Sequence, residues 1–461
     1  MTEPGGSSPR KLGLGALRAV MALVQHTESQ STAARLQLTI MTSLLMLLAT
    51  IASGVVLARA LGPSGRGILT AAMLFGPLLA NVGGLGIADA LIYQSGRSRG
   101  ARSPALMTAL GIGAAQSLVL VLAGLVIVPA LLGGPSNPAL YPSLAYLAII
   151  PLYPLNLYPM AVLQGRLRLV EFNLIRASVP ILYAASLVLL WQFGAVSVGA
   201  ALAASAICTV VANGLALSAA VKFSSGRASL PVARELLGFG LRAHAGNLAT
   251  ILGAQLDLLM LTAMVPSRDL GFYAVATSAA MTGSLIPAAA SMVLFPTFAS
   301  QSDAAVPRSL ARFLLWGLGG ALLLTPVLVM VVPWAVVPVY GTAFKAAGPI
   351  SLILVPGYVL RGSNQMLVAI LRGSGAPMRA SAGQVAGLVV LAALLPIGIS
   401  VRGAEGAALA VTVAAGAAFV WLLTTAVRSS RLAPKDAIAV WRSDLSSIKR
   451  AVWRSATIGH Q

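Results

Sequence analysis

The stretch LARALGPSGRGILTAA, from Leu57 to Ala72, decides the fold of this 461-residue chain, because LTAMVPSRDLGFYAVA, from Leu261 to Ala276, carries the same signature. In each stretch an apolar run ends in a Pro-Ser turn, and a glycine then opens the next apolar run. The matched positions are Pro63-Ser64 with Pro266-Ser267, 203 residues apart, and Gly67 with Gly271, 204 residues apart. These matches predict two halves of similar length.

A second pair of motifs agrees with this spacing. Leu163-Gln164-Gly165 and Leu371-Arg372-Gly373 lie 208 residues apart, and each follows the fourth apolar run of its half. Similar offsets at two separate anchors indicate an internal duplication, and transporters are commonly built from repeated halves.

The composition places the chain in a membrane. It is 58% hydrophobic and only 9% charged, with a mean hydropathy of +0.89, whereas soluble domains carry about 25% charged residues. A membrane-spanning strand would alternate polar and apolar residues. Here the apolar runs are continuous and rich in Leu, Ala, Val and Gly, so we predict an all-α, polytopic membrane protein.

Twelve runs approach or exceed the length of about 20 apolar residues that a helix needs to span a bilayer. They are residues 36–58, 68–92, 105–132, 140–163, 173–193, 196–221, 238–262, 271–298, 309–337, 346–371, 380–399 and 404–427. The predicted parts are a cytoplasmic N-terminal segment 1–35, an N-lobe 36–221, an inter-lobe loop 222–237, a C-lobe 238–427 and a basic cytoplasmic tail 428–461. Within the first part, Lys11–Val24 could form an amphipathic helix on the membrane surface.

The distribution of basic residues tests this count independently of hydropathy. With both termini in the cytoplasm, most of the 31 Lys and Arg residues fall in segments on the inner side, as the positive-inside rule requires. The outer loops hold only Arg59, Arg66, Arg268, Lys345 and Arg402. A wrong number of spans would scramble this alternation downstream of the error, so it supports twelve helices with both termini inside.

Several function classes are disfavoured by what the sequence contains. The net charge of +20 would suggest nucleic acid in a soluble protein, but here it sets membrane topology and contacts anionic lipid headgroups. The single cysteine, Cys208, allows no disulfide framework, and the three histidines have no metal-ligand spacing. There is no phosphate-binding Gly-x-x-x-x-Gly-Lys loop. We expect no catalytic residues, metal or cofactor.

The candidate functional residues are polar groups inside the predicted spans. A charge near the centre of a membrane helix costs about 2.5–3.5 kcal/mol on insertion scales, so it usually faces a cavity or a partner. Asp257 lies in the seventh run, and Arg361 lies in the tenth run close to Asn364. The other candidates are Asp89 in the second run, Arg242 and Asn247 in the inner half of the seventh, and Arg59 and Arg66 at the outer end of the first pair.

Each candidate has two interpretations. Arg361 and Asp257 could form a structural ion pair, Arg59 and Arg66 could reach the headgroups, and Asp89 could pair with a nearby arginine. Arg242 could be an ordinary inner-loop charge. Alternatively, the arginines line a central cavity and hold an anionic group such as a diphosphate, for which the planar guanidinium is well suited.

The motifs together resemble the Wzx-type polysaccharide transporters, a flippase family of the multidrug/oligosaccharidyl-lipid/polysaccharide (MOP) exporter superfamily. The resemblance covers residues 36–427. It rests on the stretches ARALGPSGRGILTAA with GLGIADALIYQ (Gly84–Gln94), QLDLLMLTAMVPSRDLGFYAVA, LQGRLRLVEFN and ILRGSGAPM. None of them identifies the glycan.

The resemblance implies two six-helix lobes that alternate access to a central cavity, in the V shape of MOP transporters. It implies a polyprenyl-diphosphate-linked oligosaccharide as cargo, moved from the inner to the outer leaflet of the bacterial cytoplasmic membrane. Other polysaccharide-assembly proteins would be partners. Relatives have a cationic cavity, which would place Arg361, and also Arg59, Arg66 and Arg242, at the substrate. The acidic residue of the seventh-helix motif falls on Asp257, a candidate for a coupling-ion site.

Two alternatives stay open. One is an ion-coupled exporter of small molecules from the same superfamily, although only 6% of residues are aromatic and buried acids are few. The other is a membrane scaffold that transports nothing and recruits partners through its basic tail. The sequence identifies neither the sugar nor the coupling ion.

Overall fold

The computed structural model describes residues 32–97, 102–285, 287, 290–291, 294, 297–298, 305–430, 432, 435, 438–444 and 446, with side chains for all of these except 32–37, 40 and 245–247. The predicted surface helix Lys11–Val24 lies outside these residues. The elements are α2 (Thr32–Val82), α3 (Ile87–Arg97), α4 (Ala105–Leu132), α5 (Leu140–Tyr146), η1 (Leu147–Ile149), α6 (Leu152–Gly165), α7 (Leu169–Gln192), α8 (Val198–Val221), α9 (Leu230–Met264), α10 (Ser267–Ala280), η2 (Met281–Ser284), α12 (Val306–Arg312), η3 (Phe313–Leu318), α13 (Gly319–Tyr340), η4 (Thr342–Phe344), α14 (Ala347–Gly373) and α15 (Pro377–Ser430).

The described part of the chain is helical throughout and contains no β-strand beyond one isolated bridge between Ser103 and Ser224. Helices are expected because the bilayer offers no water to bond backbone groups, and a helix pairs them within one segment. Among the described residues, seven helices are long and apolar enough to cross a bilayer, and the two halves of α9, bent by 60°, make an eighth if they form one span. The all-α membrane fold is confirmed.

Two of the helices are longer than one crossing needs. The backbone of α2 breaks at Gly62, with φ 65°, and that of α15 breaks at Arg402 and Gly403, with φ 55° at the glycine. Positive φ is a conformation that glycine adopts without the steric cost of a Cβ atom. The broken helix α15 covers two of the predicted runs, 380–399 and 404–427, and α2 covers the run 36–58 and most of the run 68–92, which ends in α3. The total of twelve spans stays a prediction.

The chain divides into two compact units. Unit 1 comprises residues 1–56, 79–126 and 145–244, and unit 2 comprises residues 57–78, 127–144 and 245–461. The divisions fall inside α2, α4, α5 and α9. The predicted lobe boundaries at residues 221 and 238 stay a prediction.

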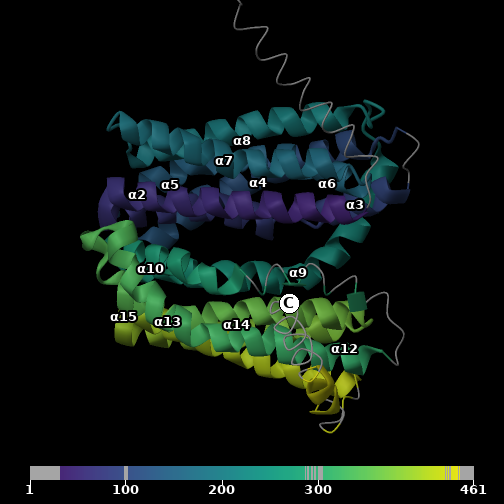
Figure 1. Cartoon of the computed structure of the whole chain (residues 1–461). Helices are drawn as coiled ribbons and strands as arrows, with labels where there is room; N and C mark the ends of the chain where they lie inside the picture. Colours follow the sequence, from purple (N-terminus) through teal and green to yellow (C-terminus); the bar gives the residue numbers. More distant parts are fainter. Residues whose placement is uncertain are drawn as a thin grey trace, which may run out of the picture. The chain divides into compact units, whose positions relative to one another are not determined.

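Unit 1 is held together by contacts of α6 with α3 and α8, and of α7 with α8 (Figure 1). A Cβ atom on Gly165 would lie 2.5 Å from the carbonyl oxygen of Ile92, so the glycine lets α6 approach α3 closely. Across the α6–α8 contact, the Asn213 amide donates to the carbonyl of Leu152 over 2.9 Å. Small residues and polar bonds between helices take the place of a hydrophobic driving force in lipid.

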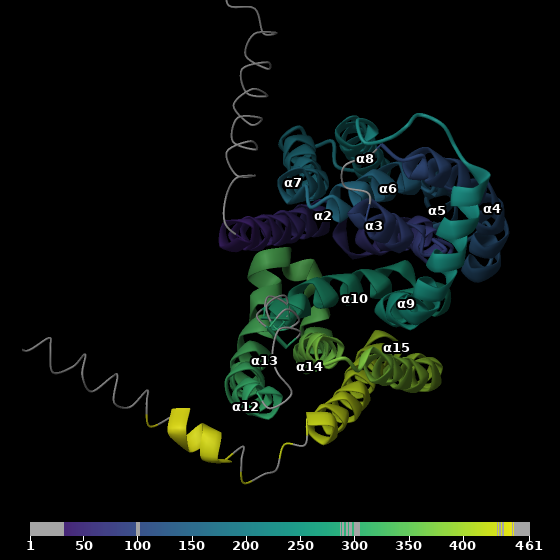
Figure 2. The same ribbon diagram turned by 90° about the vertical axis from the view of Figure 1, so that its right-hand side faces the viewer.

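Unit 2 is organised around α14, which packs against α10, α13 and α15 (Figures 1 and 2). Gly357 allows the contact with α15, since a Cβ atom there would lie 2.6 Å from Thr412 Oγ1. The Thr412 hydroxyl donates to the carbonyl of Ile353 over 2.8 Å, close to Pro356, which interrupts the backbone ladder of α14. Threonine commonly satisfies backbone groups that a proline frees in membrane helices.

The predicted duplication recurs in the backbone hydrogen bonds that end α6 and α14. After α6 the N–H groups of Arg166, Leu167 and Arg168 donate to Val162, Gln164 and Leu163, and after α14 those of Ser374, Gly375 and Ala376 donate to Ile370, Arg372 and Leu371. Every donor and acceptor of the second turn lies 208 residues beyond its counterpart in the first. The two predicted anchor motifs therefore end their helices in the same way.

The two signature stretches also contact each other within unit 2. A Cβ atom on Gly67 would lie 1.6 Å from the carbonyl oxygen of Ser267, and one on Gly271 would lie 1.9 Å from the carbonyl oxygen of Pro63. Both glycines are buried and lie within helices, Gly67 in α2 and Gly271 in α10. The matched glycines thus let α2 and α10 cross with their backbones touching.

Candidate functional site

Unit 2 encloses a cavity of about 420 Å³ between α9, α10, α14 and α15. Its polar lining residues are Thr250, Gln255, Asp257, Thr277, Ser284, Tyr358, Arg361, Asn364, Gln365 and Gln384. Polar groups are costly in the hydrocarbon region unless they face partners or a water-filled space. This concentration makes the cavity the leading candidate site.

Asp257 is the acidic group of the cavity. Its side chain is 2% exposed, and the Tyr273 hydroxyl donates to Oδ2 over 2.7 Å. The other carboxylate oxygen, Oδ1, is buried and has no hydrogen-bond partner in the described structure. A buried carboxylate oxygen without a donor is costly, so Oδ1 is available to a cation, a proton or a ligand donor.

Arg361 is the basic group of the cavity. Its Nη2 donates to the carbonyl of Gly253 on α9, and its guanidinium carbon lies 5.5 Å from the ring centre of Tyr358. In the described part of the chain, Arg361 and Asp257 form no direct ion pair. A guanidinium has five N–H donors, so donors remain for an anionic ligand.

Asn364 lies one turn after Arg361 on α14. Its Nδ2 donates to the carbonyl of Ala415 on α15 over 3.0 Å, and its buried Oδ1 has no partner in the described structure. Three of the predicted site residues therefore share one cavity. Gln384 also lines it and was missed, although an amide in the predicted eleventh run was a signal that could have pointed to it.

Two of the other predicted residues, Arg242 and Arg59, lie elsewhere. Arg242 lines a separate cavity in unit 1. Arg59 is exposed, and its Nε and Nη2 donate to the carbonyls of Val339 and Pro338 over 2.9 and 2.6 Å. These carbonyls belong to the last turn of α13, where four acceptors lack partners within the helix. Arg59 therefore caps α13.

Arg66 and Asp89 do not line the cavity of unit 2. Arg66 is half-buried on α2, and Asp89 is half-buried in the first turn of α3. The side chain of Asn247 lies outside the described residues. Their roles in binding stay predictions.

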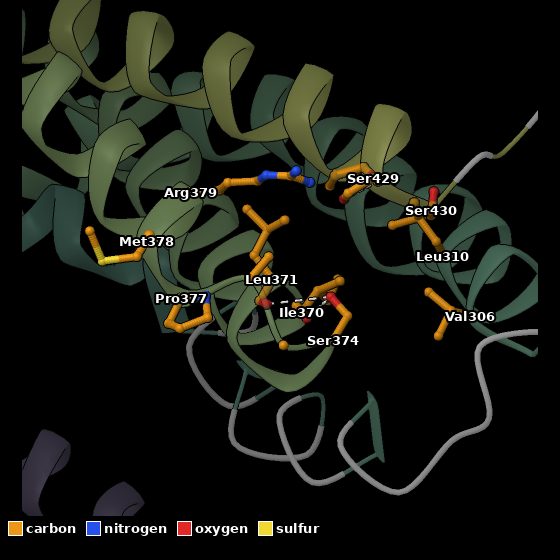
Figure 3. Close-up of a pocket in the computed structure, with 13 residues that line it drawn as sticks. Val306, Leu310, Ile370, Leu371, Ser374, Pro377, Met378, Arg379, Ser429 and Ser430 are labelled. Carbon is orange, nitrogen blue, oxygen red and sulfur yellow. Dashed lines mark hydrogen bonds between the residues drawn. The ribbon is translucent and has the colours of Figure 1, made fainter.

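Figure 3 shows another cavity in unit 2, of about 400 Å³, at the end of α14 and the start of α15. Arg379 extends towards Ser429, while apolar side chains such as Leu310 and Ile370 line the remainder. Arg379 is the one charged residue among the described residues that line it. The described lining of this cavity therefore contains no acidic group, whereas Asp257 and Arg361 line the same cavity.

The sequence pattern of the polysaccharide biosynthesis protein family matches residues 35–302, which is more than half of the chain. The chain belongs to this family. A comparison with curated protein sequences finds no match.

Solved structures show which fold this family member has. The lipid II flippase MurJ, in an inward closed conformation, matches with a TM-score of 0.68 and 13% identity, covering 87% of this chain and 89% of that chain. A multidrug resistance MATE family transporter of the MOP superfamily matches in its inward-facing conformation with a TM-score of 0.57 and 14% identity, covering 89% and 98% of the two chains. An outward-facing conformation of a MATE family transporter matches with a TM-score of 0.54 and 16% identity, covering 85% of this chain and 94% of that chain.

These matches confirm a fold of the MOP transporter type, whereas six helices in each lobe stays a prediction. The family member is a multi-pass membrane protein with the fold of MOP superfamily transporters. Within the described residues, no cluster of three or more His, Cys, Asp or Glu side chains could hold a metal ion.

Proposed function

We propose that this protein is a flippase that moves a polyprenyl-diphosphate-linked oligosaccharide from the inner to the outer leaflet of the bacterial cytoplasmic membrane, for the assembly of a surface polysaccharide. Membership of the polysaccharide biosynthesis family and the transporter fold support this. The observation that carries the proposal is the cavity in which Arg361, Asp257 and Asn364 converge inside an apolar bundle.

The chemistry of the cavity fits the head of such a lipid. A diphosphate linked to sugars cannot cross hydrocarbon unaided, whereas its polyprenyl tail need never leave it. Arg361 offers charge-assisted hydrogen bonds to phosphate oxygens. The amides of Gln255, Gln365 and Gln384 offer both donors and acceptors to sugar hydroxyls.

Asp257 is the candidate for energy coupling. Its unpaired Oδ1 can accept a proton or a monovalent cation from a transmembrane gradient. The membrane potential would act as well, at about 2.3 kcal/mol per charge per 100 mV. Binding at Asp257 would change the charge beside Arg361 and so alter the affinity of the cavity for an anionic head.

The test is translocation of a fluorescent polyprenyl-diphosphate oligosaccharide by the full chain in proteoliposomes. We expect Arg361→Gln to reduce the rate at least tenfold, because a hydrogen bond to a charged group is worth about 1.5–3 kcal/mol. Arg361→Lys should retain part of the rate, since it keeps the charge but loses the planar fork. The matched control is Arg402→Gln, an exposed arginine at the break in α15.

If the wild-type chain does not translocate the lipid, or if Arg361→Gln and the control behave alike, the proposal is wrong. If the protein were a scaffold that transports nothing, the wild-type chain would fail to translocate the lipid in every assay.

An ion-coupled exporter of small molecules is the second candidate. Two observations favour it: the fold matches multidrug resistance MATE transporters, and Asp257, which lines the cavity, has a buried carboxylate oxygen without a hydrogen-bond partner in the described structure. An exporter would lower the accumulation of a cationic dye in cells, and Asp257→Asn would abolish that effect. A flippase would leave dye accumulation unchanged.

A further inference from the structure

Unit 1 contains a cavity of about 320 Å³ where the end of α3 meets the first half of α9. Positive-inside topology assigns this end of both helices to the cytoplasmic surface. The lining residues are Ala90, Tyr93, Gln94, Arg234, Glu235, Leu236, Gly238, Phe239 and Arg242. Arg234 and Arg242 are exposed and have no hydrogen-bond or ion-pair partner among the described residues.

The wall of this cavity is built rigidly. The rings of Tyr93 and Phe239 stack with centroids 4.8 Å apart and an interplanar angle of 14°. On α3, Arg97 Nη1 donates to the Tyr93 hydroxyl over 2.7 Å, and its guanidinium carbon lies 5.5 Å from the Tyr93 ring centre. This places a third guanidinium next to the cavity.

The first half of α9 is fixed against the α2–α3 connection. A Cβ atom on Gly240 would lie 2.5 Å from the carbonyl oxygen of Leu85, so the two backbones touch. One turn further on, His244 Nε2 lies 2.8 Å from the carbonyl oxygen of Val82. Arg234 and Arg242 therefore project from a helix whose position in unit 1 is set by backbone contact.

The charges of the cavity are mixed. Arg234, Arg242 and one carboxylate, that of Glu235, line the cavity, and Arg97 lies beside the Tyr93 ring in its wall. The Glu235 carboxylate accepts a hydrogen bond from the Gln94 amide over 3.4 Å. The excess of positive charge suits phosphate oxygens, which bind guanidinium groups in bidentate fashion. The Glu235 carboxylate would repel a bare phosphate. It can, however, accept hydrogen bonds from hydroxyl groups, as can the amide oxygen of Gln94.

We propose that this cavity is a loading site at the cytoplasmic surface, which binds the phosphorylated sugar at the head of the lipid-linked oligosaccharide apart from the cavity of Arg361. This inference rests on the proposed function and deepens it. Arg234 and Arg242 bind the diphosphate, and Glu235 binds hydroxyl groups of the first sugar. An anionic phospholipid shares the phosphate chemistry but lacks the sugar ring, so the two sources can be separated.

The experiment measures binding to the purified full chain in nanodiscs, without transport, in an Arg361→Gln background that weakens the other cavity. The probes are citronellyl-diphosphate-linked N-acetylglucosamine and inorganic pyrophosphate. We expect the double variant Arg234→Gln/Arg242→Gln to raise the Kd of the sugar probe at least tenfold, because charge-assisted hydrogen bonds are lost. The control is Arg227→Gln, an exposed arginine in the connection between α8 and α9 that does not line the cavity.

Glu235→Gln separates sugar recognition from charge. It should weaken binding of the sugar probe while leaving or strengthening that of pyrophosphate, since it removes a negative charge. Nanodiscs with and without phosphatidylglycerol complete the test: a loading site for the glycan lipid binds the sugar probe in both.

The inference is overturned if the double variant binds the sugar probe as tightly as the Arg227→Gln control does. It is also overturned if phosphatidylglycerol displaces the sugar probe and Glu235→Gln has no effect, which would define a phospholipid site. Because binding is measured without translocation, these failures are distinct from a failure of the wild-type chain to move the lipid.

Discussion

Leu167 and Gly375 occupy the same backbone position in the two halves, 208 residues apart, and both have positive φ, 58° and 79°. Each follows the last turn of its helix and lets the next N–H groups return to the helix carbonyls. A glycine is the usual residue at this place because a Cβ atom in the left-handed region clashes with the carbonyl. In the first half the chain tolerates a leucine there.

Gly375 gives a test of this position without packing effects, since nothing lies within 4 Å of where its Cβ atom would be. We expect Gly375→Ala to destabilise the protein by about 1 kcal/mol, which is the cost of a non-glycine residue in the left-handed region. Gly199→Ala is the control: it has equally open space but lies in helix α8, so alanine should be neutral or stabilising there. The measurement is the thermal unfolding temperature of each variant in detergent. Equal changes in Tm for Gly375→Ala and Gly199→Ala would contradict a specific cost of the left-handed conformation at position 375.

Single residues differ in how well the sequence predicts them. Asp257, Arg361 and Asn364 could be found because polar groups in apolar runs are costly and need a reason. The partner of Arg59 could not be found, because a helix-end carbonyl some 280 residues away leaves no pattern in the sequence. The absence of a direct Asp257–Arg361 ion pair, within the described residues, also depends on side-chain positions that hydropathy does not encode.

At the scale of elements, the basic tail forms a contact that its composition did not predict. Residues 438–444 are helical, and Trp441 Nε1 donates to the carbonyl of Ala311 over 2.7 Å. Arg312 Nε lies 3.0 Å from an Asp444 carboxylate oxygen. The sequence predicted only that the tail is basic and cytoplasmic, whereas this part of the tail also bonds to α12.

The ion pair makes this contact dependent on pH. Hydrogen bonds from Arg312 hold the pKa of the Asp444 carboxyl below its ordinary value. The stabilisation is therefore complete above the ordinary pKa, about 3.9, and is lost as the pH falls through the lowered value. We expect hydrogen exchange at residues 438–444 to be constant from pH 8 to pH 5, after correction for intrinsic rates, and to rise in more acidic solution.

Asp444→Asn should raise that exchange a few-fold at neutral pH, because an exposed ion pair contributes little and the Trp441 hydrogen bond remains. Glu405→Gln is the control, since it lies on α15 outside this contact. If Asp444→Asn left the exchange and its pH dependence unchanged, the ion pair would not hold the tail.

At the scale of the whole molecule, the sequence predicted the membrane class well because composition and continuous apolar runs determine it. It predicted the duplication because matched motifs recur at similar offsets. The two short motifs that end α6 and α14 lie 208 residues apart, and the three backbone hydrogen bonds that follow each helix are separated by the same 208 residues. Where the chain divides into compact units was harder to predict. Unit 2 includes residues 57–78 and 127–144 because packing, such as the crossing at Gly67 and Gly271, sets these divisions.

The predicted topology is testable along the whole chain, since each missed or added span would invert every loop that follows it. Cys208 is the only cysteine, so Cys208→Ser provides a background for single cysteines at exposed positions. With twelve spans and both termini inside, Ser136→Cys and Ala195→Cys should react with a membrane-impermeant maleimide on intact cells. Ser225→Cys and Met378→Cys should react only after permeabilisation, because they lie in loops rich in arginine and lysine. Labelling of Met378→Cys from outside, with Ser225→Cys protected, would place an error in the span count between these two positions and would contradict a cytoplasmic tail.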